Sequence, residues 1–576
     1  MAKTKLQRQD ARYLALLLAL AILMLLVPRI MAAEYTASGA TKFVFSNSDI
    51  SVTDGNYTGY KIDGTELTIN ASGTYIVSDS CTDGSIKVKK GTTGVTLVLN
   101  GLTLTSSATA PIACNKSTEV TIVAASGTTN TLTDSAKNND DNYPDNEDAE
   151  NAVLKCNDGS QVTISGSGTL NIIAKGKNGI KSGATTDEEG TASLTIRNVN
   201  LTINASVNDA INAEQTLNIE SGTLTISAGD DAIHSDYTLN IGASGTAGPT
   251  IKITSCYEGL EAATLNIFSS NISIAASDDC LNAANSDLTG YSFSMNISGG
   301  TISAYTSSGD GFDSNGTLTI SGGSICVWSA NTADNQPLDA DGLITISGGT
   351  ILAAGGSSGM GMNLSASQAY VTFGSSMGGS MPSGGRASGS SASSSASVTK
   401  GSTVLIQSSS SSVFSTTALC DASYFFFSSP SLAAGTSYTL ASGSSTIATA
   451  AAQTGSSQTG MQPGGAPGQQ PEGGPAQPGQ APKVYLKTPN APGGSDASSG
   501  SAEDSAASSG GRFSDISPGS WYSDAVQYVC DAGLMSGTGR NTFSPGGMTH
   551  GSPPVVMGYE CFVPHHSLFT SSLGFL

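Results

Sequence analysis

The chain has 576 residues, of which only 12% are charged, and its formal net charge is −21 at pH 7. The 69 glycines suit either turn-rich β structure or disorder, and the local periodicity has to decide between them. Such an acidic surface argues against nucleic acids and anionic membranes as partners and indicates cations instead.

The first residues have the features of a secretory signal peptide. Lys3, Lys5 and Arg8 precede an apolar run at 13–27, which leads to small residues. The run is too short for a comfortable membrane span of about 20 residues. We therefore expect residues 1–33 to be cleaved, and the protein to be secreted, extracellular and without a membrane contact after cleavage.

A short phrase recurs along residues 34–374, with a carboxylate two residues before an apolar anchor and an alternating strand behind it. Examples are DDAIHSDYTLNI, SDDCLNAANSD and GDGFDSNGTLTI. The anchors lie 21 to 31 residues apart, and Val153 extends the series backward: Ile180, Ile211, Ile233, Leu260, Leu281, Phe312 and Leu338. Strand-filled units of this length are typical of a solenoid.

Paired strands lie between the anchors, as in LTISGGSIC (318–326) and ITISGGTIL (344–352). Their Leu and Ile side chains share one face, and the ISGG link bends where a glycine can take positive φ. A hairpin is conceivable for each pair, but the three-part phrase without an I′ turn favours successive sides of stacked coils. We predict an all-β fold, a right-handed parallel β-helix.

The remaining segments predict a closed end and a tethered module. Residues 375–452 combine a low-complexity loop with strand-like stretches, which we interpret as a β cap over the solenoid end. Residues 453–511 are rich in Gly, Pro, Ser and Gln and form a flexible linker in this interpretation. A further module at 512–576 follows.

If the anchors stack, the residues around them stack as two columns. The first column, two residues before each anchor, contains Asn178, Asp209, Asp231, Glu258, Asp279, Asp310 and Gln336. The second column, one residue after each anchor, contains Lys181, Asn212, His234, Glu261, Asn282, Asp313 and Asp339. Carboxylates on neighbouring coils, about 4.8 Å apart, repel one another.

A bound cation would relieve this repulsion, because Lys252 is the only Lys or Arg between residues 198 and 385. Ca²⁺ takes six to eight oxygen ligands in flexible geometry. The candidate ligands are Asp209, Asp230, Asp231, Asp236, Glu258, Asp278, Asp279, Asp310, Asp313, Asp339 and Asp341. The alternative is that these residues form turns and face water, but paired Asp residues favour calcium.

Catalysis and sugar binding make different demands on the residues. A lyase needs Arg or Lys beside the metal, but Arg197 and Lys252 are isolated, so we predict no catalytic residue and a non-catalytic protein. A hydrolase using paired Asp residues remains an alternative. Tyr305 and Trp328 align on adjacent coils and either form an outward strip for stacking on pyranose rings or cover the turn beneath them.

The phrases DDAIHSDYTLNI, DGFDSNGTLTISGGSI and PLDADGLITISGGTI resemble the repeats of secreted bacterial carbohydrate-binding domain-containing β-helix proteins. The resemblance covers roughly residues 40–450. It implies a right-handed, pectate-lyase-like β-helix that binds calcium and plant cell-wall polysaccharide, either cellulose or polygalacturonate. A surface adhesin for other glycans and a pectate-lyase-like or polygalacturonase-like enzyme are the alternatives.

The segment FSDISPGSWYSDAVQYVCDAGLMSGTGRNTFSPGGMT (513–549) resembles an S-layer homology repeat, with a helix through SDAVQYVCDAG. The resemblance implies binding to secondary cell-wall polymers of Gram-positive bacteria, and hence display at the cell surface. After Thr549 the chain departs from the pattern, since two adjacent prolines replace the expected second helix. Our hypothesis is an incomplete repeat caused by a frameshift or truncation.

Overall fold

The structure is a computed structural model that describes residues 39–55, 58–330, 335–356, 362–374, 396–409 and 411–458. The predicted signal peptide, most of the predicted linker and the predicted helical repeat at 512–576 lie outside these residues. Within them, every regular element is a β-strand. No helix of the described part is long and apolar enough to cross a membrane.

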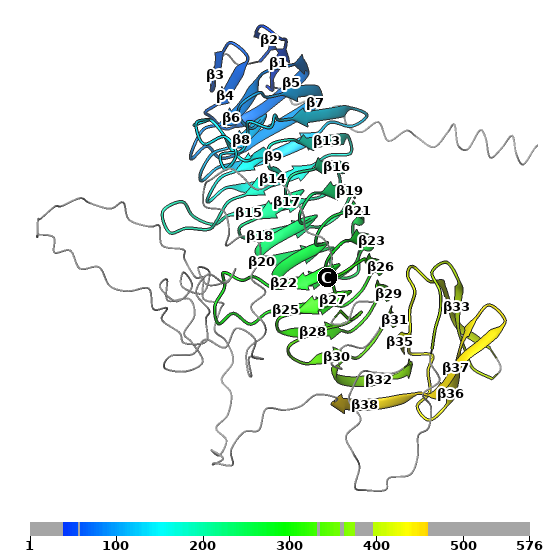
Figure 1. Ribbon diagram of the computed structural model, residues 1–576. Helices are drawn as coiled ribbons and strands as arrows, with labels where there is room; N and C mark the ends of the chain where they lie inside the picture. Colours follow the sequence, from blue (N-terminus) through cyan, green and yellow to red (C-terminus); the bar gives the residue numbers. More distant parts are fainter. Residues whose placement is uncertain are drawn as a thin grey trace, which may run out of the picture. The chain divides into compact units, whose positions relative to one another are not determined.

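The strands wind into a parallel β-helix whose coils have three sides (Figure 1). The first side stacks β4 (Glu66–Ile69), β6 (Ser85–Val88), β8 (Ile112–Cys114), β11 (Ala152–Cys156), β14 (Asn178–Ser182), β17 (Ile211–Ala213), β24 (Leu281–Ala283) and β27 (Phe312–Ser314). The second side stacks β9 (Glu119–Ala124), β12 (Gln161–Ser165), β15 (Ser193–Ile196), β18 (Thr216–Ile219), β25 (Ser294–Ile297), β28 (Thr317–Ile320), β30 (Ile344–Ile346) and β32 (Asn363–Phe373).

The third side stacks β10 (Thr129–Thr133), β13 (Thr169–Ala174), β16 (Asn200–Ala205), β19 (Thr223–Ala228), β21 (Thr250–Ser255), β23 (Asn271–Ala276), β26 (Thr301–Thr306), β29 (Ser324–Ser329) and β31 (Thr350–Gly355). Four long strands continue across a corner. β20 (Ile233–Ile241) and β22 (Leu260–Ile267) run from the first side into the second, and β5 (Gly73–Cys81) and β7 (Val95–Thr105) run from the second into the third. The prediction of a parallel β-helix is confirmed, whereas its right-handed sense stays a prediction.

Both ends of the stack are covered by antiparallel strands. At the first end, β1 (Thr41–Phe45) pairs with β2 (Ile50–Asp54), and β3 (Tyr60–Asp63) pairs with β4. At the other end, β35 (Tyr424–Ser428) pairs with β31 and β32, and a separate sheet contains β33 (Thr403–Gln407), β34 (Ser412–Thr417), β36 (Ser437–Ser442) and β37 (Ser445–Ala451). This agrees with the expected β cap.

The last strand begins where the sequence predicted a linker. β38 (Gln453–Gln458) pairs antiparallel with β32, so the folded part extends past residue 452. The polar composition of this segment hides a strand that is held through its backbone hydrogen bonds, which need no particular side chain.

The predicted anchors stack in register on the first side. Ile180 pairs with Ile211, and Leu281 with Phe312. One anchor is wrong: Leu154, not Val153, pairs with Ile180. Both residues are fully buried, so alternation of apolar and polar residues does not separate them.

The interior is one continuous apolar cluster built from the inward residues of all three sides. The seven cysteines of the described part are free thiols, and six of them are buried. They pack as small apolar side chains rather than forming disulfides.

Candidate metal centre

The structure brings the second column together on the first side of the solenoid. Parallel pairing places Asn212 beside His234, His234 beside Glu261, and Asn282 beside Asp313. Each of these residues is the first outward position after an inward anchor, so the pattern of the strands aims the side chains along one line. The predicted second column is therefore present.

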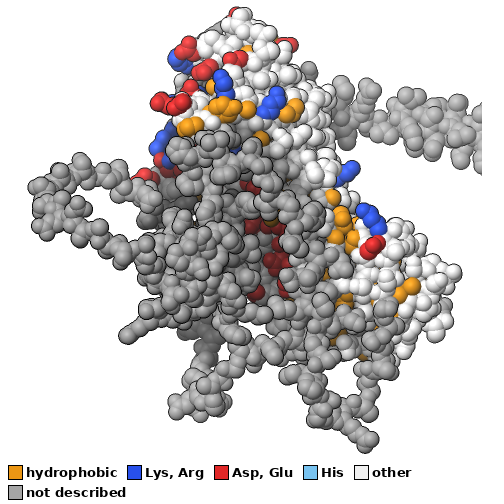
Figure 2. All heavy atoms as spheres, in the orientation of Figure 1, with side chains coloured by type: hydrophobic (Ala, Val, Ile, Leu, Met, Phe, Trp, Pro, Cys, Tyr) orange, Lys and Arg blue, Asp and Glu red, His pale blue; other side chains and the backbone are white. Residues whose placement is uncertain are grey.

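The first column lies in the turns just before these strands. The amide of Ala232 donates to the carbonyl oxygen of Glu258, and the amide of Gly259 to that of Asp279, both at 2.9 Å. Each bond runs from the residue after one column member to the column member of the next coil, and so holds the first column parallel to the second. Acidic side chains gather along the middle of the solenoid in the space-filling view (Figure 2).

Burial, reinforced by neighbouring carboxylates, raises the pKa of five acidic side chains in the columns. The pKa rises to about 7 for Asp231, about 9 for Glu258, about 8 for Asp279, about 7 for Asp310 and about 6 for Asp313. Each charged carboxylate is poorly solvated and lies near others of the same sign. In the absence of a cation, ionising this strip therefore costs folding free energy.

His234 supplies a cation of its own in the middle of the second column. Its Nδ1 lies 2.5 Å from Glu261 Oε2 and 3.3 Å from Asp231 Oδ2, and its Nε2 lies 3.0 Å from Asp236 Oδ1. Burial lowers the pKa of His234, but the hydrogen bonds to these three carboxylates outweigh it and raise the pKa well above its usual range. The imidazolium therefore neutralises part of this cluster.

A second cluster, Asp310, Asp313 and Asp339, has no such partner among the described side chains. One carboxylate oxygen from each residue lies within 4.8 Å of the others. No ion pair of the described residues involves any of the three. Oxygen ligands at this mutual distance match the preference of a hard divalent cation.

Two buried amide oxygens beside these carboxylates also lack a partner. Asn282 donates its Nδ2 to Glu258 Oε2 at 2.9 Å, which leaves Asn282 Oδ1 without a hydrogen bond. Gln336 Oε1, at the first-column position after Asp310, is likewise unpartnered. These side chains are only 8% and 4% exposed, so water does not readily satisfy their oxygens. A calcium ion would take such oxygens as ligands, so the donor set fits the predicted metal.

The other predicted ligands border these clusters. Asp209 Oδ2 accepts a hydrogen bond from Asn212 Nδ2 at 2.6 Å, and burial raises the pKa of Asp209. The amide of Asp278 donates to the carbonyl oxygen of Tyr257 at 2.9 Å, one position before the first column. Asp341 is exposed.

Asp230 lies one residue outside the first column, where its carbonyl oxygen accepts the amide of Tyr257 at 2.9 Å. Sequence reasoning left Glu261, Asn282 and Gln336 off the ligand set. All three stand in the predicted columns, so counting every oxygen donor there would have included them.

The predicted outward strip of Tyr305 and Trp328 is wrong. The two residues are paired in register, as expected, but Trp328 is fully buried. Its ring meets Phe425 edge-on with centroids 6.2 Å apart, and Lys400 Nζ lies 5.5 Å from the centroid of the Tyr305 ring. The cap therefore covers the face on which sugar stacking was expected.

The two isolated cations lie away from the columns. Arg197 follows β15 and approaches Glu220 at 3.9 Å, while Lys252 is an exposed residue of β21 on the third side. Neither stands in a column register with the acidic residues.

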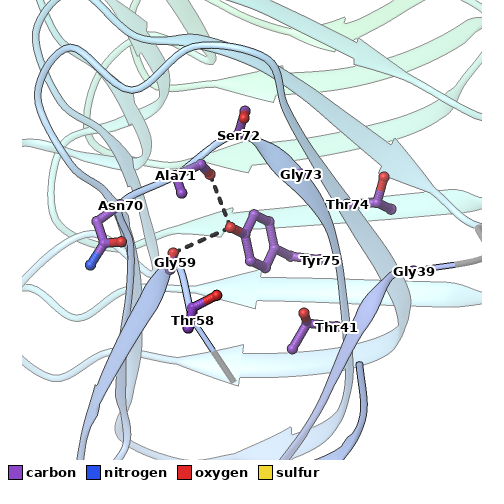
Figure 3. A pocket seen from close by; sticks show the side chains of 10 residues that line it. All are labelled: Gly39, Thr41, Thr58, Gly59, Asn70, Ala71, Ser72, Gly73, Thr74 and Tyr75. Carbon is purple, nitrogen blue, oxygen red and sulfur yellow. Dashed lines mark hydrogen bonds between the residues drawn. The ribbon is translucent and has the colours of Figure 1, made fainter. Parts of the chain in front are cut away.

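A small pocket lies at the first end of the solenoid, between β1, β3 and β5 (Figure 3). Its lining is uncharged, and the hydroxyl of Tyr75 donates to Gly59 O at 3.2 Å and Ala71 O at 2.9 Å. All the residues that line it precede residue 76, so it shares no residue with the columns.

Comparison with known proteins places these features in a family. The family model described as carbohydrate-binding domain-containing protein matches residues 63–359, and the S-layer homology domain model matches residues 512–549. A carbohydrate-binding domain-containing protein of Acetivibrio thermocellus is 33% identical over 140 residues, which are 24% of this chain and 47% of the relative. The match thus spans about half the length of that relative.

A solved structure, the gadolinium derivative of a polysaccharide lyase-like protein from C. thermocellum, is similar over 54% of this chain and 93% of its own. Its sequence identity is 22% and its TM-score is 0.30, a similarity too low to support any argument about this chain. The family model, in contrast, covers more than half of the sequence and nearly all of the coils. The chain belongs to the carbohydrate-binding domain-containing protein family.

Proposed function

We propose that this protein is a secreted, calcium-binding β-helix that binds acidic polysaccharide. The observation that carries the proposal is the strip of buried carboxylates with raised pKa values beside two unpartnered amide oxygens. At about 4.8 Å, two like charges repel by about 3 kcal/mol at an effective dielectric near 20. A bound divalent cation turns this repulsion into attraction.

The residues that would hold calcium lie on the coils after that of His234, where no protein side chain supplies a positive charge. They are Glu258, Asp279, Asp310, Asp313 and Asp339, with the amide oxygens of Asn282 and Gln336. Calcium would supply charge neutralisation and a tie between neighbouring coils. Because its coordination is flexible, calcium also accepts oxygens from a ligand outside the protein.

A carboxylate-bearing glycan fits this surface better than a neutral one alone. Calcium shared between the protein and a uronate would allow an acidic protein to hold an acidic polymer. Membership of the carbohydrate-binding family supports a polysaccharide ligand, and we extend this to plant cell-wall polysaccharide, either pectic polysaccharide or cellulose. The S-layer homology match supports attachment to a cell-wall polymer and display at the cell surface.

The test measures calcium binding and glycan binding on the same purified protein. The protein is treated with chelator, and its melting temperature is recorded with and without Ca²⁺, with Na⁺ at equal ionic strength as the control. Retention on polygalacturonate and cellulose is measured in parallel, together with release of reducing ends and unsaturated products.

We expect Ca²⁺ to raise the melting temperature and to be required for retention on polygalacturonate. An unchanged melting temperature would mean that the column residues form solvated turns and bind no calcium. Product release would establish an enzyme instead of a binding protein.

A further inference from the structure

Tyr257 is an exposed aromatic residue at the border of the acidic strip. Its side chain is 49% exposed, the highest value among the large apolar side chains of the described residues. A single exposed ring is ordinary on a protein surface, so exposure alone assigns it no role. Its place in the fold is what makes it informative.

Backbone hydrogen bonds fix Tyr257 beside the first column. Its amide donates to Asp230 O, and its own carbonyl oxygen accepts the amide of Asp278, both at 2.9 Å. Tyr257 therefore stands in line between two acidic residues and immediately before Glu258. This arrangement repeats the coil spacing of the columns, so the ring is carried by the same turns as the candidate metal ligands.

The faces of the Tyr257 ring are not packed on another aromatic ring of the described residues. The Tyr257 hydroxyl lies near the carboxylate of Asp278, the residue whose amide the Tyr257 carbonyl oxygen accepts. The ring pairs of the described residues do not include Tyr257. In contrast, Tyr237 and Tyr291, on the coils before and after that of Tyr257, pack edge to face with centroids 6.3 Å apart.

An exposed aromatic face beside the proposed calcium site matches the two parts of a uronate residue. The apolar face of a pyranose ring packs on an aromatic ring, whose polar hydroxyl stays hydrated or hydrogen-bonded. The carboxylate on the same sugar is a hard oxygen ligand, and calcium with six to eight ligands has positions for it. Asn282 Oδ1, buried and unpartnered next to Glu258, supports a cation at this part of the strip.

We propose that Tyr257 contacts the sugar ring of an acidic polysaccharide whose carboxylate completes the coordination of calcium held by the neighbouring first-column carboxylates. This inference rests on the proposed function. It adds a residue that contacts the ring of the sugar, whereas calcium binds the carboxylate of the sugar. The chemical class of the ligand is a polymer of pyranose uronates. Neutral polysaccharide lacks the carboxylate half of this contact.

The test compares Tyr257→Ala and Tyr257→Phe with the wild-type full chain, using polygalacturonate oligosaccharides as the probe in saturating Ca²⁺. Phe268→Ala is the matched control, because Phe268 is 38% exposed and lies just past the opposite end of β22. Affinity is measured by titration calorimetry, and the calcium-induced rise in melting temperature is measured for every variant. Methyl-esterified oligosaccharides, whose carboxylates are blocked, serve as the second probe.

We expect Tyr257→Ala to weaken binding about tenfold, which corresponds to a stacking contribution of about 1.4 kcal/mol, and Tyr257→Phe to remain within about twofold of wild type. All variants should keep the calcium-induced rise in melting temperature, and the methyl-esterified probe should bind weakly to each. Wild-type affinity in Tyr257→Ala with calcium-dependent binding intact would overturn the Tyr257 contact and leave the proposed function standing. Absence of calcium-dependent binding in the wild-type protein would overturn both.

Discussion

Neutralising a carboxylate of the second column should stabilise the fold without calcium and weaken the stabilisation that calcium provides. At pH 7.5 Asp313 is ionised at a cost, because burial and neighbouring carboxylates raise its pKa to about 6. Without calcium, we expect Asp313→Asn to stabilise the fold by about 2 kcal/mol, since a two-unit pKa shift corresponds to nearly 3 kcal/mol. With calcium, the same change should reduce the rise in melting temperature because a charged ligand is lost.

The control for this prediction is Asp287→Asn. Asp287 is exposed and follows β24, so neutralising it changes the net charge by the same amount outside the columns. Urea unfolding of the two variants, with chelator and with Ca²⁺, separates a local effect from a change in net charge. Equal behaviour of the two variants would contradict a metal site at Asp313.

His234 should behave as a built-in substitute for a metal ion. Its side chain is 17% exposed and bridges Asp231, Asp236 and Glu261. Removing one partner from a buried charge cluster typically costs about 3–5 kcal/mol, so His234→Gln should strongly destabilise the calcium-free protein. Added Ca²⁺ should restore part of the loss, as followed by urea unfolding. A variant as stable as wild type would show that the imidazolium is not needed for neutralisation.

At the scale of single residues, the sequence predicted the columns but not the environment of each side chain. The phrase around Asp231 and Asp313 repeats so regularly that its stacking follows from the anchors alone. Trp328 was misplaced because it is covered by Phe425, which lies nearly a hundred residues further along the chain. A contact between residues so far apart in the sequence cannot be predicted from the local alternation of apolar and polar residues.

Among the elements, the ISGG links depend on close approach between coils. A Cβ on Gly322 would lie 2.3 Å from the carbonyl oxygen of Ser298 on the preceding coil. We expect Gly322→Ala to destabilise the fold by about 2 kcal/mol or more, because the backbone has to move to relieve the overlap. Gly401→Ala is the matched control, since φ is +83° there but nothing lies within 4 Å of the added Cβ.

Thermal unfolding distinguishes steric overlap from backbone strain in this pair. Gly401→Ala should cost only about 1 kcal/mol from its left-handed backbone conformation. A smaller effect at Gly322 than at Gly401 would argue that the coils separate easily and that the links do not fix their spacing.

The sequence predicts element boundaries where apolar and polar residues alternate. Where this alternation is missing, the boundaries cannot be placed from the sequence. β18 alternates strictly, so its inward Leu217 and Ile219 are evident from the sequence. β11 contains three buried residues in succession, which made Val153 and Leu154 indistinguishable. The polar composition of β38 predicts a linker, because backbone pairing with β32, and not a pattern of side chains, sets the place of this strand.

For the whole molecule, the raised pKa values set the sign of the pH dependence. Unfolded Asp and Glu ionise near pH 4, whereas folded Asp231, Glu258 and Asp279 ionise at about pH 7, 9 and 8. Between pH 5 and 9 the folded chain therefore binds more protons than the unfolded chain, and stability falls as pH rises. The raised pKa of His234 also makes stability fall as pH rises, because the unfolded chain loses that proton above about pH 6.5 while the folded chain keeps it.

We therefore expect the melting temperature of the calcium-free protein to fall from pH 5.5 to pH 8.5. With saturating Ca²⁺ the fall should be smaller, because the carboxylates are then bound as anions. Scanning calorimetry across this range, with and without chelator, measures both slopes. A melting temperature that rises with pH in chelator would contradict the raised pKa values.

The charge of the second-column side chains changes from positive to negative along the axis of the solenoid. Lys155 and Lys181 pair on adjacent strands at its beginning, His234 stands in the middle, and Asp313 lies on β27 near the other end. Lys181 Nζ is 3.1 Å from Glu214 Oε1, so the early coils carry their own counter-charges. Calcium should therefore stabilise one half of the molecule and not the other.

Native-state hydrogen exchange can resolve this difference, because the coils of a solenoid contact only their neighbours and open in local units. We expect Ca²⁺ to slow exchange at the amides of Leu281 and Phe312, which donate to carbonyl groups of the next coil. The amides of β8 and β11, whose coils precede the acidic residues of the two columns, should exchange at nearly the same rate with and without Ca²⁺. Uniform slowing along all coils would instead mean that calcium stabilises the fold globally, and that the sign change along the second column does not localise the ions.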